Sequence, residues 1–383
     1  MGRLLFEEWH MVNSFFQASE LFSGQKFTRA NSTKRARNSV AHTSIPACRS
    51  ATHSAHWRIA AYACRTNRRG GCLMALHSFE IHRVNLEDAD GVETLGTKPK
   101  FWWFNSVGKR LLFKAEDRGT GEDWAEKIAC HLCELLGIPH VDYELAQEYE
   151  QSQPRRNGVI CENISPAPLS LVLGNQLLFE RDDSYPRDER AKYKVRQHTV
   201  AAIVGVLKSV KPPIGWPANG AIQSALDVFI GYVMLDAWIA NQDRHHGNWA
   251  AIRDVAGDLF LSPTFDHGAA LARLLTDDER AERLSTRDRN RTVDNYVARA
   301  RSACYADVSS EKPMGTLDCF TAFAAHSPVA ARGWIDRLQT TDPKLVCEIV
   351  DRVPATRISD LAKQFTVKLL QANQQRILQG VSR

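Results

Sequence analysis

The apolar residues of this chain follow two different periods, and the change from one to the other divides the sequence. Between residues 74 and 165, short runs such as SFEIHRV alternate apolar and polar side chains, which is typical of half-buried strands. From about Pro168 onward the spacing is helical almost throughout, and only the short apolar segment Leu259 to Phe265 interrupts it. A chain of 383 residues is long enough for two such units. The sequence predicts an α+β fold, with a small β-rich lobe at 74–165 and a mainly helical lobe at 166–383.

Residues 1–73 differ from the rest in composition. They hold 11 of the 49 Lys and Arg residues but only 3 of the 44 Asp and Glu residues, and no helical or strand period is sustained. We interpret them as a disordered tail or a start-site extension, with Met74 as the natural start. The formal net charge of +5 arises there, because 38 basic and 41 acidic residues follow from Met74 onward. Direct nucleic-acid binding by the folded part is therefore not expected.

Local signals predict a strand, hairpin and helix in the first lobe. The runs KFWWF and RLLFKA flank the turn at 105–108, which indicates a β-hairpin. Thr120 offers an N-cap oxygen, and the apolar residues that follow recur on one helical side until Gly137. Two further strands are predicted at Val141 to Ala146 and Gly158 to Ile164.

The most informative motif ends a long apolar helix in a polar turn. LDAWIANQDRHHGNWAAIRD contains Asp243 and Asn248 in the pattern D-x-x-x-x-N, and Asp266 follows in a D-x-G pattern with Gly268. Phosphoryl transfer needs a carboxylate near the acceptor hydroxyl, and an amide and a second carboxylate that hold Mg²⁺. This order of residues predicts that Asp243 orients or deprotonates the acceptor, while Asn248 and Asp266 bind the metal.

These segments resemble a known family. DRHHGN with FDHG is similar to the catalytic and metal-binding segments of the HipA-like serine/threonine kinases and, more distantly, of the phosphatidylinositol 3/4-kinases. LGTKPKFWW, LLFKA and GVICENISP with LGNQLL resemble the phosphate loop, the strand of the ATP lysine and the lobe-connecting region, so that the resemblance covers most of residues 78–305. It implies a bilobal protein-kinase-like fold, ATP and Mg²⁺ as cofactors, and a protein Ser or Thr hydroxyl as acceptor.

Lys114 in LLFKA is the expected ATP lysine. It needs a helix glutamate that holds it against the nucleotide phosphates, and Glu122 and Glu126 lie one helical turn apart on the same side of the predicted helix. The spacing to the following alanine favours Glu122, although both glutamates remain candidates. The alternative is that Lys114 is an exposed strand lysine and both glutamates are solvated.

The phosphate loop is defined less well, because neither G-x-G-x-x-G nor H-R-D occurs. Gly96 permits close backbone approach to a phosphate, and Lys98 and Lys100 are placed to neutralise it, unless this is a plain loop with solvated lysines. Thr97 occupies the area where some HipA-like proteins carry a phosphorylated serine. In the lobe-connecting region, the resemblance places Glu162 and Asn163 at the nucleotide.

Three other patterns have simpler explanations. His245 and His246 are adjacent, so a zinc site there is disfavoured, and the resemblance gives His245 a bracing role in the loop. Cys130 and Cys133 have CxxC spacing but lie inside the predicted helix, where small buried side chains are expected. The tryptophans are interpreted as core residues and not as base-stacking platforms.

Nine cysteines without regular spacing, and no secretory signal, favour a reducing compartment and a cytoplasmic location. The longest apolar stretch, Ala221 to Ala240, is interrupted by Gln223, Asp227 and Asp236 and is interpreted as a buried helix, not as a membrane span.

Two functions compete with a protein kinase. A phosphoinositide or small-molecule kinase uses the same Mg²⁺ chemistry, but no basic cluster that would face a membrane follows Met74. A non-catalytic kinase fold that serves as a binding module is disfavoured, because Lys114, Asp243, Asn248 and Asp266 are all present.

Overall fold

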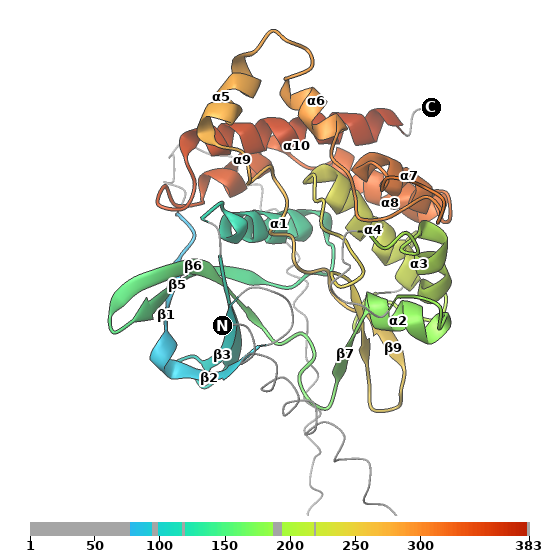
Figure 1. Ribbon diagram of the computed structural model, residues 1–383, viewed down its shortest axis with the longest axis horizontal. Helices are drawn as coiled ribbons and strands as arrows, with labels where there is room; N and C mark the ends of the chain where they lie inside the picture. Colours follow the sequence, from blue (N-terminus) through green and yellow to red (C-terminus); the bar gives the residue numbers. More distant parts are fainter. Residues whose placement is uncertain (1–76, 94–98, 117–118, 187–193, 218–219, 381–383) are drawn as a thin grey trace, which may run out of the picture. The chain divides into compact units, whose positions relative to one another are not determined.

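The computed structural model describes residues 77–380 apart from 94–98, 117–118, 187–193 and 218–219. All of these residues belong to one compact unit, His56–Arg383. Strands dominate its first part and helices its remainder (Figure 1). The tail predicted at 1–73 lies outside the described residues, as do Gly96, Thr97 and Lys98.

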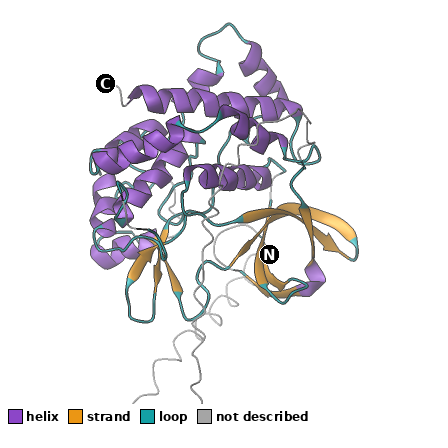
Figure 2. Cartoon of the chain, turned by 180° about the vertical axis from the view of Figure 1, so that it is seen from behind, coloured by secondary structure: helices purple, strands orange, loops and turns teal. Residues whose placement is uncertain are grey.

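A six-stranded sheet with the order β1-β5-β6-β4-β3-β2 forms the first part. Its strands are β1 (Ile81–Asn85), β2 (Ala89–Val92), β3 (Lys100–Phe104), β4 (Arg110–Ala115), β5 (Tyr143–Glu150) and β6 (Gln153–Glu162), with a 3-10 turn, Leu86–Asp88, between the first two. The β1 and β5 strands are parallel, and the other pairs are antiparallel. The sheet curls strongly when it is seen from behind (Figure 2).

The predicted hairpin is confirmed as β3 and β4. Phe101 and Phe113 face each other in the ladder and are buried, because alternate side chains of both strands point to one face. Asn105 closes the turn, since its side-chain oxygen accepts the backbone N–H groups of Val107 and Lys109. The register also places Lys114 opposite Lys100, at the end of the hairpin away from this turn.

The predicted helix is confirmed as α1 (Glu122–Leu136), in which 12 of the 15 residues are buried. It lies across the sheet and beneath the later helices (Figure 1). Gly137 ends it with φ of 65°, a left-handed conformation that glycine adopts without steric cost.

The predicted N-cap at Thr120 is wrong. The cap residue is Gly121 with φ of 93°, where a Cβ atom would overlap the Trp124 ring. The Glu116 carboxylate replaces a cap side chain, because it accepts the N–H groups of Gly121 and Glu122. Thr120 instead accepts a hydrogen bond from the Arg273 guanidinium. The Glu116 carboxylate, at the positive end of the helix, thus accepts the unpaired N–H groups that the Thr120 side chain was expected to accept.

Helices make up most of the second part. They are α2 (Gly174–Arg181), α3 (Val200–Leu207), α4 (Ala225–Trp238), α5 (Asp277–Ser285), α6 (Val293–Ala298), α7 (Thr316–Ala324), α8 (Pro328–Gln339), α9 (Pro343–Asp351) and α10 (Asp360–Gly380). A small antiparallel sheet joins β7 (Ser170–Leu173), β8 (Ala250–Arg253) and β9 (Leu259–Leu261). The sequence indicated only the last of these strands. The predicted α+β class is confirmed.

The long apolar helix of the sequence is α4, which a Ser224 capping box starts and which is buried on nearly all sides. Within the described chain, none of the helices combines the length and the apolar character that crossing a membrane requires.

A buried ion pair ties the C-terminal helical region to α1 and the sheet. Arg357 donates to the Asp123 carboxylate at 2.5 Å and to the Ala146 carbonyl oxygen at 2.9 Å, and the Arg357 and Asp123 side chains are 2% and 1% exposed. Burial raises the pKa of Asp123 to about 6, with a further rise from Glu116, while Arg357 acts in the opposite direction. At pH 7 the carboxylate is therefore charged and depends on Arg357.

We expect Arg357→Ala to lower the free energy of unfolding by about 3–5 kcal/mol at pH 7, because it leaves a buried charge uncompensated. Since the Asp123 pKa is already raised, this destabilisation should shrink as the pH falls below about 6 and the carboxyl becomes neutral. Urea unfolding at pH 7 and pH 5 measures both effects. The control is Arg332→Ala, which removes an exposed pair with Asp336 and should cost less than about 1 kcal/mol. Equal losses in the two variants would contradict this role of Arg357.

Candidate active site

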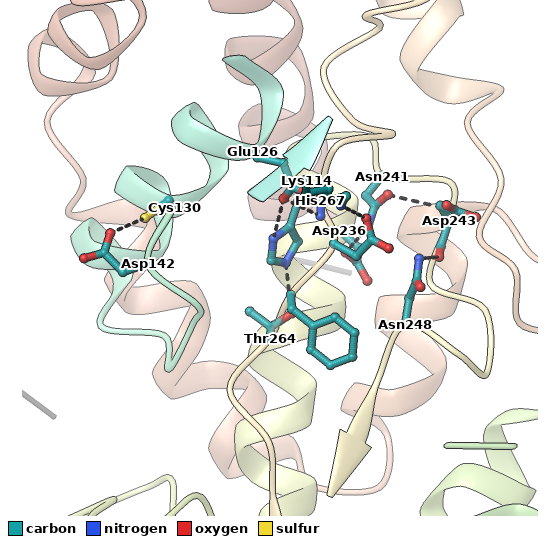
Figure 3. Close-up of polar contacts among 12 residues, drawn as sticks. Lys114, Glu126, Cys130, Asp142, Asp236, Asn241, Asp243, Asn248, Thr264 and His267 are labelled. Atoms are coloured by element: carbon teal, nitrogen blue, oxygen red, sulfur yellow. Dashed lines mark hydrogen bonds and ion pairs between the residues drawn. The ribbon is translucent and has the colours of Figure 1, made fainter. Parts of the chain in front are cut away.

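Lys114 lies at the centre of a buried ion-pair network. Its ammonium is 2.7 Å from the Glu126 carboxylate of α1 (Figure 3). It also pairs with the Asp266 carboxylate. Burial alone would lower the pKa of Lys114, but the carboxylates of Asp266 and Glu126 outweigh it and raise the pKa well above its ordinary value. Lys114 is therefore a permanently charged, fixed cation and not an exposed strand lysine.

The structure pairs Lys114 with Glu126 and not with Glu122, which the spacing favoured. Glu122 lies one turn earlier on α1 and accepts from the Arg273 guanidinium at 2.6 Å. Its carboxylate is buried and belongs to a separate pair. The preference for Glu122 is corrected because helical spacing puts both residues on one side, while the approach of Arg273 decides between them.

The segment around Asp266 is anchored to α1. Asp266 has φ of 59°, in the left-handed region that non-glycine residues seldom adopt and that concentrates at functional sites. The next backbone N–H, that of His267, donates to the second Glu126 oxygen at 2.7 Å. At Gly268 a Cβ atom would come within 3.3 Å of the Glu122 carbonyl oxygen and of the Glu126 carboxylate. Glu126 thus positions both the lysine and the Asp266 segment.

His267 supports this segment as a neutral side chain. Its ring is buried, and Nε2 lies 2.9 Å from the Thr264 hydroxyl. Burial, followed by the nearby Arg244 charge, moves the pKa of His267 well below its ordinary value. The neutral ring adds no positive charge beside Lys114.

Asp243 and Asn248 lie in the loop that follows α4, which we call the 241–248 loop. The Asn248 side-chain N–H donates to the Asp243 backbone carbonyl oxygen at 2.8 Å. This hydrogen bond holds the two residues together and does not involve the Asp243 carboxylate. The Asp243 carboxylate is 21% exposed and has His245 Nε2 at 3.6 Å. Its partial exposure leaves it accessible to a reacting group.

Two residues that the sequence did not indicate hold this loop against the Asp266 segment. Arg244 is buried and makes two hydrogen bonds of 2.8 Å to the Asp236 carboxylate at the end of α4. The same guanidinium donates to the Asn248 carbonyl oxygen at 2.6 Å and to the Phe265 carbonyl oxygen at 3.4 Å. Arg244 therefore joins α4, the 241–248 loop and the residue before Asp266. The sequence offers one signal for this pair, an aspartate inside an apolar helix, Asp236, eight residues before Arg244. This signal alone does not show that the two residues pair.

The two adjacent histidines do not converge on one centre. The backbone N–H of Gly247 donates to His245 Nδ1 at 3.0 Å, which braces the turn as expected. His246 instead lies 2.8 Å from the Tyr185 hydroxyl in the helical part. Their rings are perpendicular, with centroids 6.1 Å apart, and this arrangement does not suit a shared ion.

The remaining candidates lie apart from this network or outside the described residues. Glu162 ends β6 and pairs with Lys109, the residue just before the neighbouring strand β4. Asn163 follows it and caps the next turn by accepting the Ser165 N–H at 3.0 Å. Gly96 and Lys98 lie in the connection between β2 and β3, which is not described. The structure thus brings together Lys114, Glu126 and Asp266 by direct contact, and joins Asp243 and Asn248 to them through Arg244.

The core predictions are confirmed for cysteine and, in part, for tryptophan where the chain is described. Cys130 and Cys133 are buried in α1 with free thiols. Trp103, Trp238 and Trp249 are also buried, whereas Trp102 and Trp216 are only partly buried, so the core prediction holds for three of these five tryptophans.

The chain matches no protein-family model and no curated protein sequence. Among solved structures it is similar to the Helicobacter pylori proinflammatory kinase CtkA, with a TM-score of 0.56 and 17% identity over 77% of this chain and 96% of that one. Weaker similarities are to a Shewanella oneidensis toxin–antitoxin HipA complex (TM-score 0.46, 12% identity, 76% of this chain and 66% of that one) and to the Golgi casein kinase (TM-score 0.40, 14% identity, 80% and 74%).

The similarity to CtkA establishes the fold of this chain as protein-kinase-like, with a mixed sheet in the N-terminal lobe and helices in the remainder. At this level of identity the likeness concerns the fold, so the function has to be argued from the site.

Proposed function

We propose that this chain is an ATP- and Mg²⁺-dependent phosphotransferase of the HipA-like type that phosphorylates a Ser or Thr hydroxyl of a protein. The observation that carries the proposal is the buried Lys114 ammonium, which a strand supplies and which contacts both Glu126 of α1 and Asp266. A fixed lysine between a helix glutamate and a metal-binding aspartate is the arrangement that phosphoryl transfer by kinases requires.

The side chains suit ATP and Mg²⁺. Asp266 offers a carboxylate, and Asn248 donates through its NH₂ group, which leaves the amide oxygen as its ligand atom. Carboxylate and amide oxygens are ligands that Mg²⁺ prefers, and Lys114 would contact the nucleotide phosphates. When bound, the metal would neutralise charge that develops on the transferred phosphate.

Asp243 is assigned the acceptor side of the reaction. Its carboxylate is partly exposed, whereas Lys114 and Glu126 are nearly covered, so an acceptor hydroxyl can reach Asp243 from solvent. In this role it accepts the hydroxyl proton or orients the hydroxyl toward the phosphate. We also propose Glu162 and Asn163 as nucleotide contacts at the lobe connection, and Gly96 and Lys98 as contacts in the phosphate loop. We further propose a cytoplasmic location.

A phosphorylation assay tests the proposal. The full-length protein is incubated with γ-labelled ATP, Mg²⁺ and a cell extract, and the labelled products are identified by mass spectrometry. We expect phosphorylated Ser or Thr residues that are absent when Lys114→Met replaces the unaltered protein. Label in lipid or in small molecules would instead support the alternative acceptors. Binding of Mg·ATP without any transfer would identify a binding module.

The two α1 glutamates give a matched pair of variants. Glu126→Gln removes the charge that fixes Lys114, and the loss of a buried, charge-assisted hydrogen bond, about 1.5–3 kcal/mol, should lower kcat/KM for ATP by about 10- to 100-fold. Glu122→Gln also removes a buried carboxylate, but its partner is Arg273, so we expect a fall in melting temperature with kcat/KM changed by less than about threefold. Measurement of kcat/KM and melting temperature for both variants separates the two roles. Equal kinetic losses would refute the assignment of Glu126.

A further inference from the structure

A second cluster of polar side chains lies at the far half of α1 from Lys114. The potential ligand atoms of Cys130, Glu134 and His140 all lie within 4.8 Å of one another, and in the described part of the chain no other set of three Cys, His, Asp or Glu side chains does so. Asp142 lies beside this set, because its carboxylate is 3.4 Å from the Cys130 thiol (Figure 3), although it completes no further set of three within 4.8 Å among the described residues. None of these four residues takes part in the proposed phosphoryl transfer.

The local fold brings the four residues together. Cys130 and Glu134 are one turn apart on α1 and therefore share a face. The left-handed Gly137 reverses the chain at the end of the helix, and the Ile138 N–H closes this turn on the Cys133 carbonyl oxygen at 2.9 Å. His140 and Asp142 then return along the side of α1 just before β5. All four residues come from one stretch of 13 residues, so the cluster depends on little long-range structure.

The hydrogen bond of His140 leaves one ring nitrogen available to a metal. Its Nδ1 lies 2.7 Å from the Ile138 carbonyl oxygen, so the neutral ring carries its proton on Nδ1 and its lone pair on Nε2. Metal-binding histidines usually donate their other ring N–H in this way, often to a backbone carbonyl, which fixes both tautomer and orientation.

The donor set identifies the class of ion. The Cys130 thiol, the His140 imidazole and the Glu134 carboxylate supply three ligands, and Asp142, which lies beside the thiol, or a water molecule would supply the fourth that tetrahedral zinc takes. The soft sulfur and the imidazole disfavour Mg²⁺ and Ca²⁺, which prefer sites made of oxygen alone. The Glu134 side chain is 43% exposed, so an ion can enter from solvent, whereas the Cys130 side chain lies below the surface.

We propose that Cys130, Glu134 and His140, with Asp142 beside the thiol, form a zinc site that is distinct from the phosphoryl-transfer site. Binding forms a bond from the Cys130 sulfur to Zn²⁺ and releases the thiol proton to solvent, with no change in oxidation state. The hydrogen bond between Cys130 and Asp142 and the ion pair between Glu134 and His131 give way to metal ligation.

The site fastens the end of α1 to the segment that carries Asp266. The Thr264 N–H donates to the Pro139 carbonyl oxygen and the Val141 N–H to the Thr264 carbonyl oxygen, both at 2.9 Å. Thr264 lies two residues before Asp266, so an ion bound to α1 and to the 138–142 turn also restrains the approach to Asp266. The ion is structural in this proposal and takes no part in the reaction.

Cobalt(II) is the probe, because it replaces zinc and its thiolate complexes absorb by sulfur-to-metal charge transfer. We expect full-length protein treated with a chelator to bind one equivalent of Co²⁺ with this band and the visible bands of tetrahedral cobalt, and Zn²⁺ to displace it. Cys130→Ser should remove the charge-transfer band. Glu134→Gln changes an exposed side chain and should not prevent folding, yet it should weaken the affinity at least tenfold.

The matched controls are other cysteines. Cys347→Ser, on α9, should bind Co²⁺ like the unaltered protein, as should a variant with Cys48, Cys64 and Cys72 all changed to Ser, which tests thiols outside the described residues. The proposal is overturned if the unaltered protein shows no charge-transfer band, if the band survives Cys130→Ser, or if Glu134→Gln binds as tightly as the unaltered protein. The measurement uses no ATP, so its outcome is independent of the proposed kinase activity.

Discussion

Asp243→Asn should lower turnover by about 10²-fold or more while Mg·ATP binding stays nearly unchanged. The proposed role of Asp243 is confined to the acceptor hydroxyl, so its loss should be felt in the transition state and not in the affinity for nucleotide. The 241–248 loop should keep its geometry, because the Asp243 carbonyl oxygen, which the substitution does not alter, accepts the Asn248 side chain. Arg244 holds the same loop from beneath through Asp236 and the Asn248 carbonyl oxygen.

Calorimetric titration with Mg·ATP beside a turnover assay measures the two quantities, with autophosphorylation or ATP hydrolysis as the readout until an acceptor is known. Asp183→Asn is the control, because it makes the same change at an exposed position of the helical part. Full activity of Asp243→Asn would show that the carboxylate has no part in the reaction. A loss of nucleotide binding would instead place it among the nucleotide ligands.

Asp266→Asn should weaken Mg·ATP binding at least tenfold and lower turnover with it, because an amide removes a full negative charge from the metal shell. The substitution should not change the backbone conformation at this position. Asp266 has φ of 59°, and asparagine tolerates this left-handed conformation as well as aspartate does, so strain is not added. Asp266→Ala would combine the loss of charge with an unfavourable backbone conformation and would be harder to interpret.

The same two assays apply to Asp266→Asn, with circular dichroism as a check on folding, since the variant also loses the ion pair with Lys114. Unchanged Mg·ATP affinity in a folded Asp266→Asn protein would remove this residue from the metal site. The contrast between the two variants is the decisive result: Asp243→Asn separates binding from turnover, and Asp266→Asn lowers both.

The sequence predicted correctly those elements that interactions between neighbouring residues determine. The alternation around the 105–108 turn predicted the hairpin that carries Lys114, and the apolar spacing with Gly137 predicted α1 and its end. The spacing of Asp243, Asn248 and Asp266 suggested one site, and the structure places Asp243 and Asn248 in one loop that Arg244 ties to the residue before Asp266.

Contacts between distant segments could not be predicted in this way. Glu122 and Glu126 have the same helical phase, and Arg273, about 150 residues later, decides which of them is left for Lys114. The prediction of a Thr120 cap failed in part for the same reason, because the distant Arg273 donates to the Thr120 hydroxyl, while the nearby Glu116 accepts the helix N–H groups. The Arg244–Asp236 pair depends on how the chain turns after α4, and no periodicity encodes that turn.

The charges along α1 restrict how this molecule can be switched. Glu122, Asp123 and Glu126 occupy its first turns, and each is paired with a nearly buried cation from a different part of the chain. Sliding or rotating the helix would separate all three pairs together, and a charge left buried without its partner costs on the order of 3–5 kcal/mol. An outward movement of α1 would therefore have to break three links to three different parts of the chain at once, which favours control through the loops or through access to the substrates.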